Sequence, residues 1–132
     1  MIYLALHPDR DVPASEVSGA FEISEHHVAK AAKDLTRAGY LRARRGRGGG
    51  LRLARPAHEI EVGAVVRHTE DLNLLECFDS ERDQCKITPA CTLKGVLARA
   101  GEAFLTVLDG VTLADLVQPR ERALRRLLPQ VE

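Results

Sequence analysis

The chain has 132 residues, of which 45% are hydrophobic and 29% are charged. This composition is typical of one folded domain, or of a domain with an appendage. No apolar run approaches the ~20 residues that span a bilayer, and the first residues lack the basic flank and cleavage site of a secretory signal. We therefore expect a cytoplasmic protein with no membrane partner.

Charge is segregated along the chain, although the formal net charge is zero. Residues 30–55 hold nine Lys or Arg and one acid, a balance of +8, while residues 59–83 hold eight Asp or Glu and two Arg, a balance of −6. A basic block followed by an acidic block predicts one polyanion-binding face and one part with a different role.

Three helices are predicted in the first third of the chain. Short helical patterns cover residues 1–8 and 13–21, and residues 25–38 repeat apolar side chains at helical spacing. Ser24 is the expected N-cap of the third helix and Gly39 its C-terminal cap.

A β-hairpin is predicted next. Residues 40–44 and 51–55 alternate as strands do, the glycine-rich stretch 45–50 forms a flexible turn, and Pro56 ends the second strand. Short helices, a basic helix and a hairpin follow one another in this way in a winged helix-turn-helix. The predicted fold class is thus mainly α with a small β-hairpin.

The second half predicts a helix over residues 59–69, an irregular acidic stretch over 70–90, and a long helix that begins with Thr88 and ends at Gly110. The apolar stripe of the long helix contains Leu93, Val96, Leu97, Ala100, Phe104, Val107 and Leu108. Residues 112–115 resemble a capping box that starts one more turn.

We divide the chain into four parts. They are a winged helix-turn-helix (1–56), a connecting helix with a cysteine-bearing loop (57–91), a dimerisation helix (92–117) and a loosely held basic tail (118–132).

The basic helix and the hairpin predict DNA binding. A helix N-terminus fits the major groove, where base edges differ in donors and acceptors, and arginines on a turn can enter the minor groove or neutralise phosphates. The expected contacts are Ser24, His26, His27, Lys30, Lys33, Arg44, Arg45 and Arg47. For the two histidines the alternative is a solvated charged face. RNA is the weaker partner because no paired aromatics on a strand could stack bases.

The three cysteines, Cys77, Cys85 and Cys91, lie within fifteen residues of one another. A disulfide would leave one thiol over, so a metal or redox site is favoured. If the long helix begins with Thr88 as its N-cap, Cys91 is its third helical residue and its thiolate lies in the field of the helix N-terminus. An iron–sulfur cluster suits such a soft, anionic site. A zinc site with a histidine and three unliganded thiols remain as alternatives.

Several longer stretches recur in order in a known family. They are LTRAGYL (35–41), RRGRGGGLRL (44–53), LNLLEC (72–77), CKITPACTLK (85–94), FLT (104–106) and TLADLV (112–117). In them the sequence resembles the winged-helix iron–sulfur transcription regulators of bacteria, and among these the nitric-oxide-sensitive repressors.

The resemblance implies a homodimer joined through the long helix that binds a palindromic DNA operator. It implies an iron–sulfur cluster on the three cysteines, most often [4Fe-4S], with [2Fe-2S] as the alternative. Nitric oxide would nitrosylate this cluster and release the repressor from nitric-oxide detoxification genes. The cluster-biogenesis regulators of the family carry a histidine where this chain has Lys94, which favours the nitric-oxide branch over an iron–sulfur-status, redox or zinc-responsive regulator.

A fourth ligand is not identified. Family members begin further upstream, where some supply an aspartate from the partner subunit, and no residue here occupies that position. His7, Asp9, His58 and His68 qualify only by side-chain chemistry, and we expect them to be surface residues. No nucleophile–base pair, phosphate-cradling motif or pair of catalytic carboxylates is recognisable, so we expect no enzyme activity.

Overall fold

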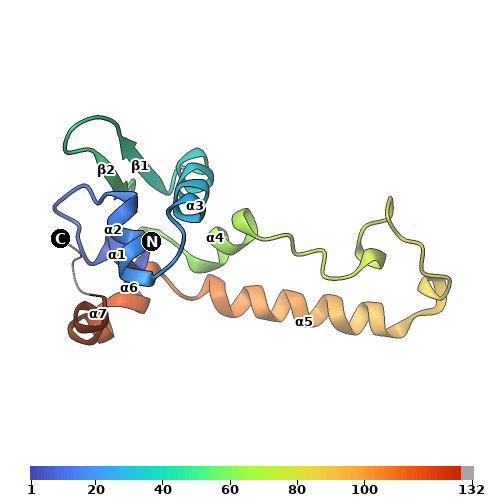
Figure 1. The fold of residues 1–132 in the computed structure, drawn as a ribbon. Helices are drawn as coiled ribbons and strands as arrows, with labels where there is room; N and C mark the ends of the chain where they lie inside the picture. Colours follow the sequence, from blue (N-terminus) through green and yellow to red (C-terminus); the bar gives the residue numbers. More distant parts are fainter. Residues whose placement is uncertain (129–132) are drawn as a thin grey trace.

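The computed structural model describes residues 1–128 and has two parts (Figure 1). The head combines residues 1–61 with residues 110–128. The arm consists of the loop at residues 70–91 and the long helix α5 (Thr92–Asp109), which runs back beside it. Helix α4 (Val62–Thr69) joins the two. The structure is mainly helical with one two-stranded hairpin, which confirms the predicted fold class. No helix within residues 1–128 is long and apolar enough to cross a membrane.

The head opens with a short helix and a helix-turn-helix. They are α1 (Ile2–Ala5), α2 (Ala14–Phe21) and α3 (Glu25–Arg37). The turn between α2 and α3 holds Glu22 in the left-handed region, with φ 53°, and the Ser18 hydroxyl donates to the carbonyl of Ile23 at 2.7 Å. Helix α3 buries Val28 and Ala32, and Ala32 packs in one cluster with Tyr3 and Leu4 of α1, against which Val17 and Ala20 of α2 also pack.

The end of α3 is set by Gly39, as predicted. This glycine has φ 79°, and its N–H donates to the carbonyl of Thr36 at 3.0 Å, while the N–H of Tyr40 donates to the carbonyl of Leu35 at 2.9 Å. These two bonds form a Schellman motif, which requires a residue that tolerates positive φ. The motif turns the chain directly into the hairpin.

Strands β1 (Leu41–Arg44) and β2 (Gly50–Leu53) pair antiparallel, with Leu41 opposite Leu53 and Arg44 opposite Gly50. The second strand begins one residue earlier and ends two residues earlier than the alternation predicted. On the β2 side of the hairpin, Leu51 also forms an isolated antiparallel bridge with Val12. This bridge binds the hairpin to the segment that precedes α2.

The hydrophobic core lies in the head. One cluster packs Tyr3, Leu4, Val12, Ala32, Leu41 and Leu51, and a second packs Leu6, Tyr40, Ile60, Leu113 and Val117. No residue between 64 and 112 is buried. The second cluster brings helix α6 (Leu113–Val117) back beneath α1, so the arm leaves the head and returns to it at adjacent points (Figure 1).

A short antiparallel bridge between Glu61 and Thr112 closes the base of the arm. Because Glu61 is extended there, the predicted helix over 59–69 is divided into the 3-10 turn η1 (Ala57–Glu59) and α4. The predicted capping box is confirmed, since the Thr112 hydroxyl accepts from the N–H of Asp115 and the Asp115 carboxylate accepts from the N–H of Thr112.

The start of the long helix differs from the prediction. Residues Thr88–Ala90 form a separate 3-10 turn, η3, and α5 begins at Thr92 with Cys91 as its N-cap at φ −82° and ψ 106°. Thr88 is not the N-cap of α5, because the extended backbone of Cys91 separates η3 from the helix. The Thr88 hydroxyl donates to the carboxylate of Asp83 at 2.9 Å. Helix α5 ends before Gly110, as predicted.

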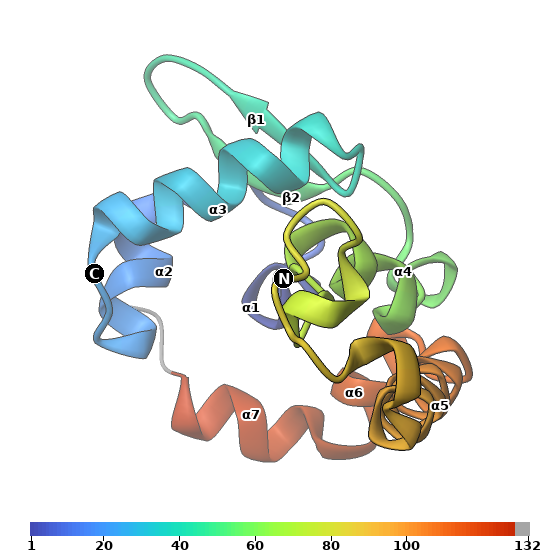
Figure 2. The ribbon, with the colours of Figure 1, turned by 90° about the vertical axis from the view of Figure 1, so that its right-hand side faces the viewer.

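The basic tail is also more ordered than expected. It forms the 3-10 turn η4 (Gln118–Arg120) and helix α7 (Glu121–Leu127), and Leu124 and Leu128 pack against the core. The rest of the predicted tail, residues 129–132, lies outside the described residues. Viewed along the arm, α6 and α7 lie on the side of the head opposite α3 and the hairpin (Figure 2).

Candidate nucleic-acid interface and cysteine loop

Helix α3 presents a basic face to solvent. Since Val28 and Ala32 turn inward, the helical repeat places His26, Lys30 and Lys33 on the opposite side, and all three are exposed. Arg37 continues the same face and was not among the predicted contacts, although its spacing would have indicated it. Ser24 occupies the N-cap position, but its side chain makes no capping bond, which leaves its exposed hydroxyl available to another partner.

His27 lies at the flank of this face. It lines a groove of about 460 Å³ between α3 and the end of α4, where Lys30 and Arg37 on one wall face His68 and Glu70 on the other. Of the two adjacent histidines, His26 is therefore the one at the centre of the exposed face.

The hairpin holds its three predicted arginines in two different ways. Arg45 and Arg47 are exposed and make no ion pair or side-chain hydrogen bond within residues 1–128. The Arg44 guanidinium instead contacts the Asp11 carboxylate at 2.6 Å and donates to the carbonyl of Gly48 at 2.6 Å. Asp11 was not predicted at this site, because it lies in a loop far from the hairpin in the chain.

The three cysteines lie in the arm. Cys77 belongs to the 3-10 turn η2 (Glu76–Phe78), Cys85 lies in the loop and Cys91 is the N-cap of α5. All three are free and half-buried. Nevertheless, among residues 1–128 no three potential ligands are close enough to form a metal-binding group, so the structure does not bring the cysteines together.

The hydrogen bonds of the loop are local. The Asp83 carboxylate, for example, accepts from the N–H of Cys85 at 3.0 Å and from the Thr88 hydroxyl at 2.9 Å. Within the described residues no side-chain hydrogen bond or ion pair ties residues 71–90 to α5 or to the head. The loop is thus ordered in short turns but is not anchored as a whole.

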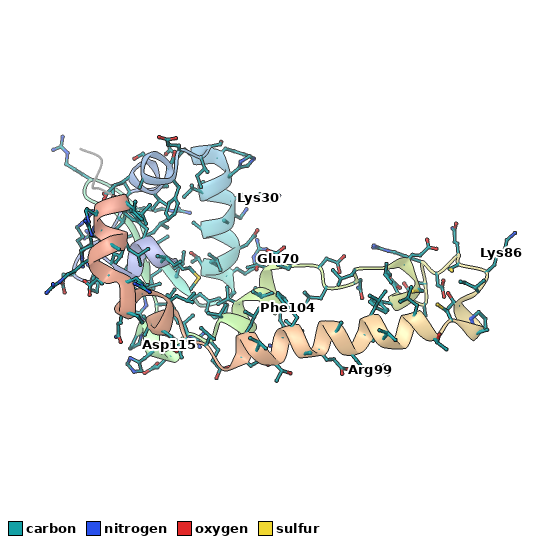
Figure 3. All side chains as sticks on the ribbon, turned by 90° about the horizontal axis from the view of Figure 1, so that it is seen from below. Lys30, Glu70, Lys86, Arg99, Phe104 and Asp115 are labelled. Atoms are coloured by element: carbon teal, nitrogen blue, oxygen red, sulfur yellow. The ribbon has the colours of Figure 1, made fainter. Side chains whose placement is uncertain are left out.

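The basic face and the tip of the cysteine loop lie in different parts of the molecule, the head and the end of the arm. Figure 3 shows Lys30 on α3 in the head and Lys86 at the tip of the arm. His7 is not a surface residue, contrary to expectation: it is 9% exposed, and its Nδ1 lies 2.9 Å from the carbonyl of Tyr3. His7 and the exposed His58 belong to the head rather than to the cysteine loop.

The donors in the arm fit an iron–sulfur cluster by their chemistry. Three thiols without a disulfide are the soft ligands that iron in such clusters requires. Their separation means that they could hold a cluster only after the loop closes. The absence of an anchor on the loop is compatible with such a movement.

The comparisons with known proteins agree with this architecture. The Rrf2 family, described as iron-dependent transcriptional regulators, matches residues 1–119. The HTH-type transcriptional regulator NsrR of Geobacillus kaustophilus is 46% identical over 127 residues, which cover 96% of this chain and 86% of the relative.

Solved structures give the same result. The structure of T. potens IscR has a TM-score of 0.70 and 28% identity, covering 92% of this chain and 80% of its own. CymR, the global cysteine regulator of B. subtilis, has a TM-score of 0.68 at 24% identity over 89% of this chain and 86% of its own, which supports the fold alone.

These relatives are transcription regulators and not enzymes, and a regulator of this kind implies DNA binding. The match to the Rrf2 description over residues 1–119, together with the 46% identity over most of the chain, settles the family. The chain is a member of the Rrf2 family of iron-dependent transcriptional regulators.

Proposed function

We propose that this transcription regulator is a homodimeric repressor that senses nitric oxide through an iron–sulfur cluster held by Cys77, Cys85 and Cys91. The observation that carries the proposal is the 46% identity to NsrR over 96% of the chain, together with three free thiols in the arm that extends from the head. When bound, the cluster supplies a reaction centre for nitric oxide, most often as [4Fe-4S] and otherwise as [2Fe-2S].

The proposed DNA contacts lie on the exposed face of α3 and on the hairpin. His26, Lys30 and Lys33 are placed for the major groove, with Ser24 at the helix N-terminus and His27 at the flank. Arg45 and Arg47 are placed for the phosphates or the adjacent minor groove. We expect the operator to be palindromic because a two-fold dimer presents two such faces.

The proposed dimer forms through α5. Leu93, Val96, Phe104 and Val107 are between 48% and 70% exposed, and with Ala100 they form one stripe at helical spacing. Leu97 and Leu108, predicted in the same stripe, are half-buried. An apolar stripe of this length is covered by a second copy of the helix in the proposed dimer.

The chain's own residues carry the signal in this proposal. The thiols bind the cluster and close the loop, α5 transmits the new position of the loop to the head, and α4 lies beside α3 at the groove that Lys30 and Glu70 line. A coupling of about 1–3 kcal/mol between the two ends is enough to change operator affinity by about 5- to 150-fold.

The test uses full-length protein purified without oxygen. Iron and sulfide content, the visible spectrum and DNA binding are measured during a titration with nitric oxide. We expect a coloured protein that bleaches stoichiometrically and releases operator DNA. Cys91→Ser should lose the iron, while Ser80→Ala, a control on the same loop, should keep it.

Two results would contradict the proposal. A Cys91→Ser variant that keeps full iron and still responds to nitric oxide would remove the ligand assignment. Zinc in place of iron and sulfide, with DNA binding that is insensitive to nitric oxide, would favour a zinc-responsive or redox-responsive regulator of the same family.

A further inference from the structure

We propose that Asp11 is a positioning residue for the hairpin. It withdraws Arg44 from DNA and fixes the tip of the hairpin, so that Arg45 and Arg47 are the arginines that reach phosphates. This inference rests on the proposed DNA-binding face and identifies which arginines of the hairpin contact DNA phosphates.

The Asp11 carboxylate contacts one arginine from each strand of the hairpin. Its Oδ2 is 2.6 Å from Nε of Arg44 on β1, and its Oδ1 accepts from Nε of Arg52 on β2 at 3.1 Å. The Asp11 side chain is only 14% exposed, whereas the Arg44 and Arg52 side chains are 66% and 43% exposed, so the carboxylate is the part of these pairs that is shielded from solvent.

The backbone next to Asp11 is fixed to the same strand. The N–H of Val12 donates to the carbonyl of Leu51 at 2.9 Å, and the N–H of Leu51 donates to the carbonyl of Val12 at 2.7 Å. A Cβ at Gly50 would lie 2.6 Å from the carbonyl atoms of Val12, so only glycine permits this approach. Asp11 is therefore held in a fixed position relative to the hairpin.

Arg44 also binds a second partner within the hairpin. One Nη donates to the carbonyl of Gly48 at 2.6 Å, which closes the turn across its own tip. Asp11 pairs with Arg44 and Arg52 together, so these three groups carry a net charge of +1 instead of +2. The Arg44 guanidinium is held by Asp11 and by the carbonyl of Gly48. Arg45 and Arg47 carry no such partner within residues 1–128.

Salt dependence of DNA binding separates these roles, because each phosphate contact contributes a slope of about 0.9 in log K against log salt. We would measure it with a labelled mixed-sequence duplex of about 30 base pairs, three helical turns. Arg47→Gln and Arg45→Gln should each make the slope shallower by about 0.9, and Arg44→Gln should leave it unchanged. Asp11→Asn should make it steeper by about 0.9, because Arg44 is then free.

Amide hydrogen exchange without DNA independently tests whether the contacts of Asp11 with Arg44 and Arg52 stabilise the hairpin. Asp11→Asn should speed exchange across residues 44–52, while Asp9→Asn, whose exposed side chain makes no bond to the hairpin in the described residues, should not. Thermal unfolding of both variants verifies that they are folded.

Three outcomes would overturn the inference. They are a slope for Arg44→Gln that falls as much as that for Arg47→Gln, a slope for Asp11→Asn equal to that of the unmodified chain, and unchanged exchange in Asp11→Asn. Failure of the unmodified chain to bind any duplex would instead contradict the proposed DNA contacts, since the exchange measurement does not depend on DNA.

Discussion

The head and the arm differ in how far they can cover their own apolar side chains. Within residues 1–128, the head contains all thirteen buried hydrophobic residues, from Tyr3 to Val117, whereas no residue of the arm is buried. Of the eleven large hydrophobic side chains that are exposed in this described part, seven belong to the arm. The head is thus folded by its own core, whereas in the proposed function the arm gains its burial from a second chain and from the group that its cysteines bind.

This difference matches the two tasks proposed for the molecule. A DNA-binding face has to be held rigid, because its side chains must meet bases and phosphates in a fixed register. A sensing part has to exist in two states with a small difference in free energy, which is easier where few contacts are formed.

The largest effect is expected from a charge in the exposed stripe of the arm. Phe104→Glu would place two carboxylates in the proposed two-fold interface, and should raise the dimer dissociation constant about 1,000-fold, or ~4 kcal/mol. Sedimentation velocity measures it. Arg99→Glu, on an exposed part of α5 outside the stripe, is the control. An unchanged dimer in Phe104→Glu would mean that the arm is covered in another way.

Truncation of apolar side chains should sharpen the contrast next. Ile60 is 1% exposed in the head, and Ile60→Ala should lower the free energy of unfolding by about 3 kcal/mol. Val107 is 70% exposed in the arm, and Val107→Ala should lower it by about 0.5 kcal/mol or less. Both changes are made in the Phe104→Glu background, where the dimer does not contribute, and urea unfolding compares them. Equal costs would show that the arm has a core of its own.

Alkaline pH should weaken the head. Burial, together with the hydrogen bond from the Tyr3 hydroxyl to Glu16 at 2.7 Å, raises the pKa of Tyr3 from 10.0 to about 12. The unfolded tyrosine ionises first, so this stabilisation is present below pH 10 and is lost as pH rises towards 12, at about 1.4 kcal/mol per pH unit.

Denaturant titrations at several pH values measure this slope, and Tyr3→Phe should remove it. Tyr40→Phe is the matched control, because the Tyr40 hydroxyl makes no side-chain hydrogen bond in the described part of the chain. The arm contains no tyrosine. A slope that survives in Tyr3→Phe but disappears in Tyr40→Phe would place the titrating group elsewhere in the head.

The smallest effect on stability is expected where α4 contacts the end of α5, at the joint between the head and the arm. Arg67 on α4 forms two hydrogen bonds to the Asp109 carboxylate at the end of α5, one of them at 2.7 Å, and they lower the pKa of Asp109. Both side chains are well exposed, so Arg67→Gln should hardly change thermal unfolding. It should still speed amide exchange in the last turns of α5. Unchanged exchange would show that the joint does not depend on this pair.

Local sequence signals predicted much of this structure. Gly39 and the Thr112–Asp115 box act through bonds to residues a few positions away, so their patterns are visible in the chain. The same reasoning placed the start of the long helix wrongly, because Thr88–Ala90 form a separate 3-10 turn and Cys91 is extended between this turn and α5. A Thr-Pro pair is compatible with the start of either kind of turn, so spacing alone did not distinguish them.

The contacts that arrange the site join distant parts of the chain. Asp11 meets Arg52 across 41 positions, and no periodicity connects a loop acid to an arginine in a later strand. The clustering of the cysteines within fifteen residues predicted a common site, but the structure keeps them apart, and the proposed site requires a closure of the loop that the sequence does not describe.

Amide hydrogen exchange on the full chain, with and without its reconstituted cluster, tests the central claim most directly. We predict that the head is protected equally in both states, whereas residues 70–91 and α5 gain protection only in the loaded protein and lose it again on treatment with nitric oxide. Equal protection of the arm in both states would contradict the account, because the arm would then be folded without the group it is proposed to bind.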